Sequence, residues 1–200
     1  MDGLIEGPDG RIRCAWHGNQ DDYLAYHDGE WGRPVSDDIR LFEKICLEGF
    51  QAGLSWITIL RKRENFREAF AGFDPNVIAT WGEAEVERLL ANPGIIRHRG
   101  KIEAAITNAR VWQEIEKKEG FDRYLWKYVG FEPLQNRFER QSDVPAWTPL
   151  SKQISADLKK RGFKFCGPTI VYAFMEAVGM VNDHLTCCPR HQAVAQRPKH

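Results

Sequence analysis

The segment Cys46–Trp56 carries side chains that could hold a flat, electron-poor ring. Glu48 supplies a carboxylate and Trp56 an indole, and Gly53 lies in the turn between them. A carboxylate can accept hydrogen bonds from a ring's polar edge, while an indole face stacks on the ring itself. These residue types at this spacing predict a binding site for a heteroaromatic ligand.

An amphipathic helix would have to present Glu48 to that ligand. The preceding apolar residues follow helical spacing after a cap at Ser36 or Asp37, and they are Leu41, Phe42, Ile45 and Cys46. Glu48 falls at the edge of this apolar stripe, so we expect it to be partly buried and to need a donor from the protein or from a ligand. The alternative is that Glu48 caps a neighbouring helix or reaches water.

Helical patterns cover most of the chain after its first thirty residues, whereas alternating strand patterns are nearly absent. We expect an all-α fold with helices at Asp37–Gly49, Ser55–Ala71, Pro75–Trp81, Glu83–Leu90, Lys101–Lys118, Asp122–Val129, Ser151–Arg161 and Thr169–Val178. The segment Glu132–Pro149 contains three prolines and is expected to be a long surface loop.

The composition favours a single compact unit. Two hundred residues, 42% of them hydrophobic, suffice for one core, and we expect one domain over 1–200 with peripheral tails at 1–12 and 189–200. No apolar run is long enough to span a bilayer, and the first residues lack a signal-peptide pattern. Five cysteines, two of them adjacent, are a poor basis for disulfides. These features predict a cytoplasmic protein, expected to be a monomer, without a membrane partner.

Charge does not by itself indicate a nucleic-acid partner. Lysine and arginine number 28, as do aspartate and glutamate, but basic residues cluster at 61–63, 97–101 and 159–164. Local patches can bind phosphate in a neutral protein because charges are screened over about 10 Å at moderate salt. Each cluster is also typical of an ordinary solvated surface.

One basic cluster follows a short turn between two expected helices. Gly94 lies in this turn, and it is followed by Arg97, Arg99 and Lys101. The start of the second helix would leave backbone N–H groups unpaired at the positive end of its dipole, which favours an anion. The pattern is that of a helix-hairpin-helix element gripping a nucleic-acid phosphate, although Ile96 replaces the motif's second glycine. A plain turn between helices with basic ends is the alternative.

Cysteine and histidine occur near both ends of the chain. Cys14 and His27 near the beginning, with His184 and Cys188 near the end, could form the closed set of two nitrogen and two sulfur ligands that structural zinc favours. Spacing alone leaves other ligands open, namely His17, Cys187 and His191. Free cysteines without a metal are a further alternative.

The chain resembles the DNA-3-methyladenine glycosylase I family of the helix-hairpin-helix superfamily. The resemblance extends from Cys14 to Cys188, and its most specific blocks are Tyr26–Gly32, Cys46–Trp56, Gly94–Ile102, Leu158–Phe165 and Val181–His184. It implies a helix-hairpin-helix glycosylase fold in which a structural zinc site joins the N- and C-terminal segments. The zinc ligands implied by the resemblance are Cys14, His27, His184 and Cys188.

The resemblance also implies a role for each candidate site residue. Glu48 would accept hydrogen bonds from an extruded base, with Tyr26 as its companion and Trp56 as the stacking surface. Further aromatic wall candidates are Trp16, Tyr23 and Trp31. The residues that would enter the duplex are Gln51, Gly53 and Leu54, and the hairpin residues Gly94, Arg97, Arg99 and Lys101 would contact DNA.

The implied activity is hydrolysis of the bond that joins N3-methyladenine to its sugar in duplex DNA, without a lyase step. The methylated base is cationic and already a good leaving group, and residues 102–120 contain none of the aspartates usual in the wider superfamily. The partners would be double-stranded DNA containing 3-methyladenine and the released base. Two other functions stay open: a non-catalytic, zinc-clamped DNA-binding module, and a binder of small purines.

Overall fold

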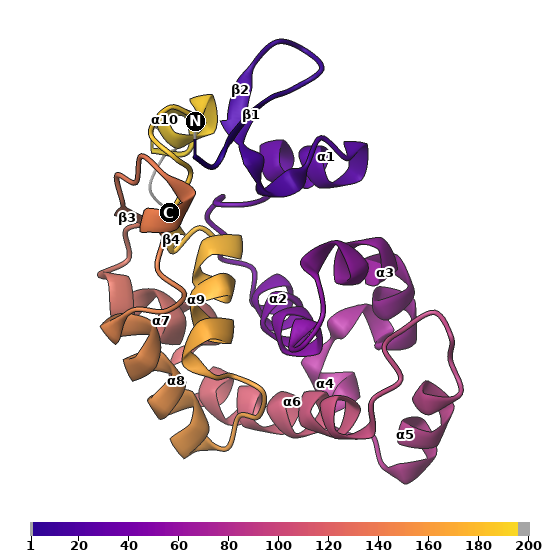
Figure 1. Ribbon diagram of the computed structural model, residues 1–200. Helices are drawn as coiled ribbons and strands as arrows, with labels where there is room; N and C mark the ends of the chain where they lie inside the picture. Colours follow the sequence, from indigo (N-terminus) through magenta and orange to yellow (C-terminus); the bar gives the residue numbers. More distant parts are fainter. Residues whose placement is uncertain (1, 196–200) are drawn as a thin grey trace.

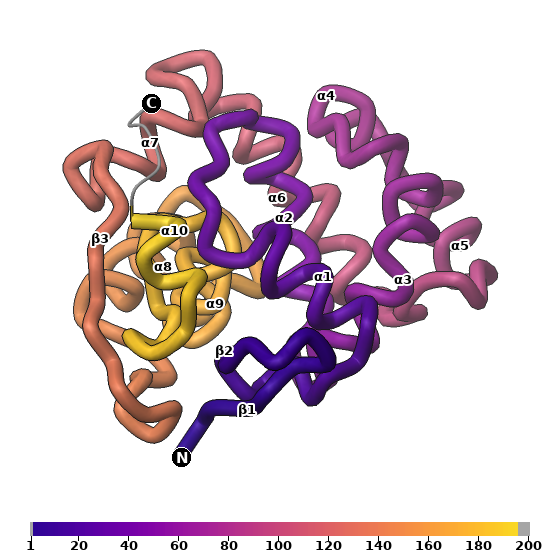
Figure 2. Tube along the Cα trace, turned by 90° about the horizontal axis from the view of Figure 1, so that it is seen from above, coloured from indigo at the N-terminus to yellow at the C-terminus, as the bar shows by residue number. Residues whose placement is uncertain are grey.

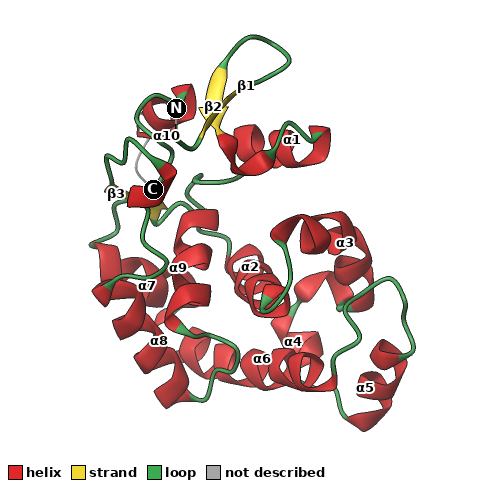
Figure 3. Ribbon diagram, viewed as in Figure 1, coloured by secondary structure: helices red, strands yellow, loops and turns green. Residues whose placement is uncertain are grey.

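A computed structural model describes residues 2–195, and within them helices predominate (Figures 1 and 3). The α-helices are α1 (Asp21–Gly29), α2 (Asp38–Gln51), α3 (Trp56–Ala69), α4 (Pro75–Ile78), α5 (Glu83–Leu90), α6 (Arg99–Glu119), α7 (Phe121–Trp126), α8 (Pro149–Arg161), α9 (Pro168–Ala177) and α10 (Pro189–Ala195). Four short 3-10 helices cover Ala15–His17, Ala71–Phe73, Lys127–Val129 and Gln141–Asp143. The expected helical class is confirmed.

Helix α2 forms the centre of the molecule, between α9 and α3, with α6 running beneath it (Figure 1). Asp37 caps its first turn by accepting from the Arg40 backbone N–H at 2.8 Å. Its own apolar side chains are buried in the core, among them Leu41, Phe42, Ile45, Leu47 and Phe50. Because its surroundings are packed, α2 can hold Glu48 in a fixed place.

Helix α1 lies in a stretch for which the sequence predicts no helix. Its residues show almost no amphipathic pattern, and only Tyr26 and His27 among them are buried. Two acidic residues in its first turn, Asp21 and Asp22, favour the helix dipole. Tertiary contacts of its buried pair therefore stabilise α1 more than any periodic apolar face.

The ends of the described chain are regular. Strand β1 (Leu4–Glu6) pairs antiparallel with β2 (Ile12–Cys14), and α10 packs against β2. The β1–β2 pair and α10 both lie at the top of the molecule in Figure 1, and therefore toward the viewer in Figure 2. The two segments expected to be tails thus contain ordered elements at the periphery, and residues 196–200 lie outside the described residues.

The segment expected to be a long loop, 132–149, is anchored at two points. Strand β3 (Leu134–Gln135) pairs in parallel with β4 (Val181–Asn182), and Gln141–Asp143 forms a 3-10 turn. Over the described residues, no helix has both the length and the apolar character needed to cross a membrane.

Candidate functional site

A cavity of about 210 Å³ opens between α1, α2, the start of α3 and α9. Binding sites for drug-sized molecules usually measure about 300–1,000 Å³, so this cavity suits a smaller ligand such as a single ring system. Its lining includes the six residues that the resemblance assigns to the base site, namely Trp16, Tyr23, Tyr26, Trp31, Glu48 and Trp56. Gln51, one of the three residues expected to enter the duplex, also lines it.

Five aromatic residues line the cavity. The Trp16 ring lies edge-on to Tyr23 at 4.9 Å and to Trp31 at 5.0 Å between centroids. The Tyr26 and Trp56 rings are 5.6 Å apart and tilted by 44°. None of these pairs is a parallel stack, so these rings do not cover one another's faces, and aromatic faces attract cations.

Glu48 places a carboxylate in this aromatic wall. The residue is 4% exposed, and within residues 2–195 no hydrogen bond or ion pair reaches its carboxylate. Burial raises the pKa of Glu48 to about 8, and the positive charge of Lys44 only partly opposes this effect. The expected protein donor is therefore missing from the described chain, which leaves the acceptor sites of Glu48 open to a ligand.

Tyr26 is the polar neighbour of Glu48. Burial, followed by the charge of Glu48, raises the pKa of Tyr26 well above its ordinary value, so its hydroxyl stays protonated. Lys44 lies over the Tyr26 ring at 5.2 Å and 3.7 Å from Glu30. The phenol is thus a fixed, neutral hydrogen-bonding group on the cavity wall.

Two further acidic residues line the cavity that the sequence does not single out. Asp183 accepts from the Tyr172 hydroxyl and from the Asn136 amide, each at 2.6 Å. Burial, and then the nearby Asp183 and Glu48, raise the pKa of Glu176 well above its ordinary value. In the sequence, Asp183 is adjacent to the expected metal ligand His184, so it is not distinguished from the motif residues around it. Glu176 lies within an apolar helix and has no local signal of its own.

The turn after α2 comes directly after the cavity residues Glu48 and Gln51 in the chain. Gly53 has a φ of 81°, a conformation that favours glycine, and Leu54 is 42% exposed. Of the residues expected to enter DNA, Gln51 lines the cavity, and Gly53 and Leu54 follow shortly after it in the chain.

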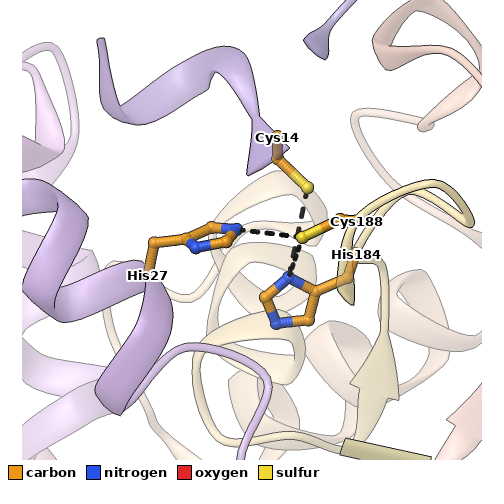
Figure 4. Close-up of side chains that lie close together, drawn as sticks. All are labelled: Cys14, His27, His184 and Cys188. Carbon is orange, nitrogen blue, oxygen red and sulfur yellow. Dashed lines mark hydrogen bonds between the residues drawn. The ribbon is translucent and has the colours of Figure 1, made fainter. Parts of the chain in front are cut away.

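The four expected metal ligands come together in the fold (Figure 4). The ligand atoms of Cys14, His27, His184 and Cys188 all lie within 4.8 Å of one another, and all four residues are buried. Cys188 Sγ is 3.8 Å from His27 Nε2 and 4.0 Å from His184 Nδ1. Two thiols and two imidazoles in a compact closed set fit the tetrahedral coordination of zinc.

The other ring nitrogens of the two histidines are also held. His27 Nδ1 lies 2.8 Å from Asp28 Oδ1, and the buried Arg13 donates to that same carboxylate from Nε at 3.1 Å and from Nη2 at 2.9 Å. His184 Nε2 lies 3.2 Å from the carbonyl oxygen of Trp31. Such outer partners orient metal-binding imidazoles. Because Trp31 also lines the cavity, the cluster and the aromatic wall share one framework.

The hairpin residues have different environments. Arg97 is exposed and has no hydrogen bond or ion pair within the described chain, whereas Arg99 pairs with Glu83, Glu87 and Glu103. Gly94 is tied to α3, since its carbonyl accepts from Lys62 and Asn65 at 3.3 Å each. Lys101 is buried, and its ammonium bonds the backbone of α2.

Backbone N–H groups are left open beside Arg97, as the sequence predicts. Among residues 2–195, nothing accepts from the amides of Ile96, Arg97 and Arg99. His98 caps α6 by accepting from the Lys101 N–H at 3.2 Å. The hairpin therefore presents unpaired amides and one unpaired guanidinium at a helix start, which suits an anion.

The fold and the cavity together define a helical protein with one small, aromatic-lined cavity beside a buried carboxyl group. A family model described as methyladenine glycosylase matches residues 16–191. The DNA-3-methyladenine glycosylase of Haemophilus influenzae is 50% identical over 178 residues, or 88% of this chain and 96% of the relative. DNA-3-methyladenine glycosylase 1 of Escherichia coli is 51% identical over 177 residues, or 88% and 95%.

A solved structure of a 3-methyladenine DNA glycosylase I variant in complex with 3-methyladenine has the same fold. Its TM-score is 0.87 at 38% identity, and the match covers 94% of this chain and 98% of that one. The chain belongs to the methyladenine glycosylase family. The expected resemblance and enzyme class, a DNA-3-methyladenine glycosylase that hydrolyses N-glycosyl bonds, are confirmed.

Proposed function

We propose that this enzyme extrudes N3-methyladenine from duplex DNA, encloses it in the aromatic cavity and hydrolyses the bond to its sugar. The observation that carries this proposal is the buried Glu48 carboxylate, which has no partner within the described chain and stands in a wall of aromatic rings. An extruded cationic base would supply a hydrogen-bond donor and a positive charge, which would lower the pKa of Glu48 and favour its ionised form. The complex of a relative with 3-methyladenine supports this choice of base.

Selectivity in this proposal follows from charge. A methylated adenine is a cation whose bond to the sugar is already weak, so catalysis needs extrusion and preferential binding more than a strong acid. Extrusion costs a few kcal/mol and costs least for a damaged base. Glu48 and the aromatic faces then stabilise the cation, whereas a neutral adenine gains less from either.

A reaction without a lyase step is part of the proposal. Lyase chemistry would need an amine that attacks the sugar carbon and forms a Schiff base. The described cavity lining contains no lysine. Helix α6, which follows the hairpin, also contains no aspartate that could assist in the way usual in the superfamily. Water is therefore the proposed nucleophile.

The duplex would lie across the hairpin and the turn that follows α2. Arg97 and the open amides would hold a phosphate, and Gln51, Gly53 and Leu54 would enter the space left by the base. Gly94 would contribute its backbone. Arg99 would first have to leave its three carboxylates, so it is the weaker phosphate contact.

The Cys14, His27, His184 and Cys188 cluster would hold a structural zinc ion. Four protein ligands leave no open position, so the metal would not take part in the reaction. Its effect on the base site would pass through α1, where Tyr26 in the cavity precedes the ligand His27. We further propose a single-domain monomer that acts in the cytoplasm.

Incubation with methylated duplex DNA tests the proposed function directly. Chromatography of the released bases should show 3-methyladenine, with abasic but uncleaved DNA remaining. Binding of duplex DNA without base release would support the non-catalytic module instead. Binding of free 3-methyladenine without any binding of duplex DNA would support the purine binder.

A further inference from the structure

Lys101 stands in the hairpin cluster, yet its side chain does not face solvent. The residue is 7% exposed, and its Nζ donates to the carbonyl oxygen of Phe50 at 2.9 Å and to that of Ala52 at 2.6 Å. These carbonyls belong to the last turn of α2 and to its C-cap. The last carbonyls of a helix have no partner within the helix and carry its negative dipole end, so an ammonium group stabilises them.

No backbone group replaces Lys101 at these two carbonyls. In the turn after α2, the Ala52 N–H donates to Gly49 and the Leu54 N–H to Gln51. Within the described chain, Lys101 is thus the sole donor to the Phe50 and Ala52 oxygens. Removing it would leave one buried and one partly buried acceptor unpaired.

The end of α2 that accepts hydrogen bonds from Lys101 also contains residues of the base site. Gln51 lies between the two bonded residues and lines the cavity, and Glu48 lies less than one turn before Phe50. On another face, a Cβ at Gly49 would come within 3.3 Å of both Cβ and the carbonyl oxygen of Phe165. The last turn of α2 is therefore held between Lys101 of α6 and Phe165 in the loop before α9.

We propose that Lys101 is a positioning residue that fixes the end of α2 to the hairpin, and that it is not a phosphate contact. Through its two bonds, the element that grips the DNA backbone sets the position of Glu48 and of the turn that enters the duplex. This inference rests on the proposed function. Arg97, exposed and unpaired in the same hairpin, is the contrasting phosphate ligand.

Lys101→Met tests the inference, with Lys117→Met as the matched control because Lys117 is exposed on the same helix. For Lys101→Met we expect base release at saturating enzyme, in a single turnover, to fall about tenfold to a hundredfold, since small displacements near a reacting centre cost this much. The salt dependence of binding to undamaged duplex should not change. Lys101→Arg, which keeps two or more donors, should recover part of the rate.

Hydrogen exchange provides a readout that does not depend on activity. Backbone amides of residues 51–55 should exchange faster in Lys101→Met than in the unmodified protein or in Lys117→Met. Should Lys101→Met fail to fold, Lys101→Gln, which keeps one amide donor, takes its place in every measurement.

Three results would overturn the inference. These are an unchanged exchange pattern, a rate at saturation equal to that of the unmodified enzyme, or a salt slope for undamaged duplex that falls by about one, as the loss of a phosphate contact predicts. An unmodified enzyme that releases no base would contradict the proposed function instead, and hydrogen exchange and the salt slope would still decide the role of Lys101.

Discussion

The burial of Glu48, which the proposed function requires, lowers the stability of the folded protein as pH rises. Burial raises its pKa from 4.5 to about 8, so the folded chain binds its proton more tightly than the unfolded chain does. Between about pH 4.5 and 8 the folded state therefore carries the extra proton, and this residue's contribution to stability falls as pH rises through that window. One unit of pKa corresponds to about 1.4 kcal/mol, so a shift of this size is worth several kcal/mol.

Glu48→Gln should accordingly stabilise the protein while impairing it. We expect a higher melting temperature than that of the unmodified protein at pH 8 and a much smaller difference at pH 5, because glutamine has no proton to lose. Thermal melts at several pH values measure this, with the exposed Glu114→Gln on α6 as control. Equal melting temperatures at both pH values would mean that Glu48 ionises without penalty.

Trp56 should contribute mainly to holding the base. Stacking on an aromatic side chain is worth about 1–3 kcal/mol per base, so Trp56→Ala should weaken binding of free 3-methyladenine by about tenfold to a hundredfold. Titration calorimetry measures this change. Trp147→Ala, a tryptophan 49% exposed and outside the cavity lining, should bind like the unmodified protein. A similar loss in both variants would argue against a specific stacking role for Trp56.

Residue types and local spacing predicted that Glu48 and Trp56 share one site because both lie in one short segment, and both line the cavity. The contribution of Glu176 could not be predicted from its segment, since it enters the cavity from α9, far away in the chain. The same holds for the bonds from Lys101 to α2, which join residues about fifty positions apart. Long-range contacts of this kind depend on the fold and not on local pattern.

At the scale of the elements, the hairpin contains two arginines, Arg97 and Arg99, that look equivalent in the sequence but have different environments. Arg97→Ala should weaken binding of damaged and undamaged duplex alike and lower the salt slope by about 0.9, as expected for one phosphate contact. Arg99→Ala should have the smaller effect, because its charge is already met by three carboxylates. Binding measured across a series of salt concentrations tests both. An equal effect of the two variants would show that Arg99 leaves its carboxylates when DNA binds.

Helix boundaries could be predicted where caps are explicit. Asp74 accepts from the Asn76 N–H and precedes Pro75, as its sequence indicates. Helix α8 begins two residues before the expected Ser151, because Thr148 is the cap and Ser151 completes the capping box. Helix α1 was not predicted, since its burial serves the cavity and the Cys/His cluster and leaves no amphipathic pattern.

On the scale of the whole molecule, the Cys/His cluster joins the two ends of the described chain. We expect one zinc ion per protein molecule by metal analysis, and we expect Cys14→Ala or a strong chelator to lower the melting temperature substantially, because metal binding is coupled to folding. Cys187→Ala is the matched control, since Cys187 is exposed and adjacent to the cluster but outside it. Folded, active protein without metal would contradict this expectation.

The proximity of residues 14 and 188 determines when the base site can be completed during protein synthesis. A ribosome reaches His184 and Cys188 only after the rest of the cavity wall has been made. Bringing residues 14 and 188 together closes a loop of about 170 residues, which costs roughly 5 kcal/mol of chain entropy, and the contacts that offset this cost form only when the last ligands are present. Until then His27 lacks two of its cluster partners, and α1 holds Tyr26 less firmly. A nascent, unfinished chain would therefore present an incomplete base site, and the ability to select a damaged base would arise only as the last ligands are added.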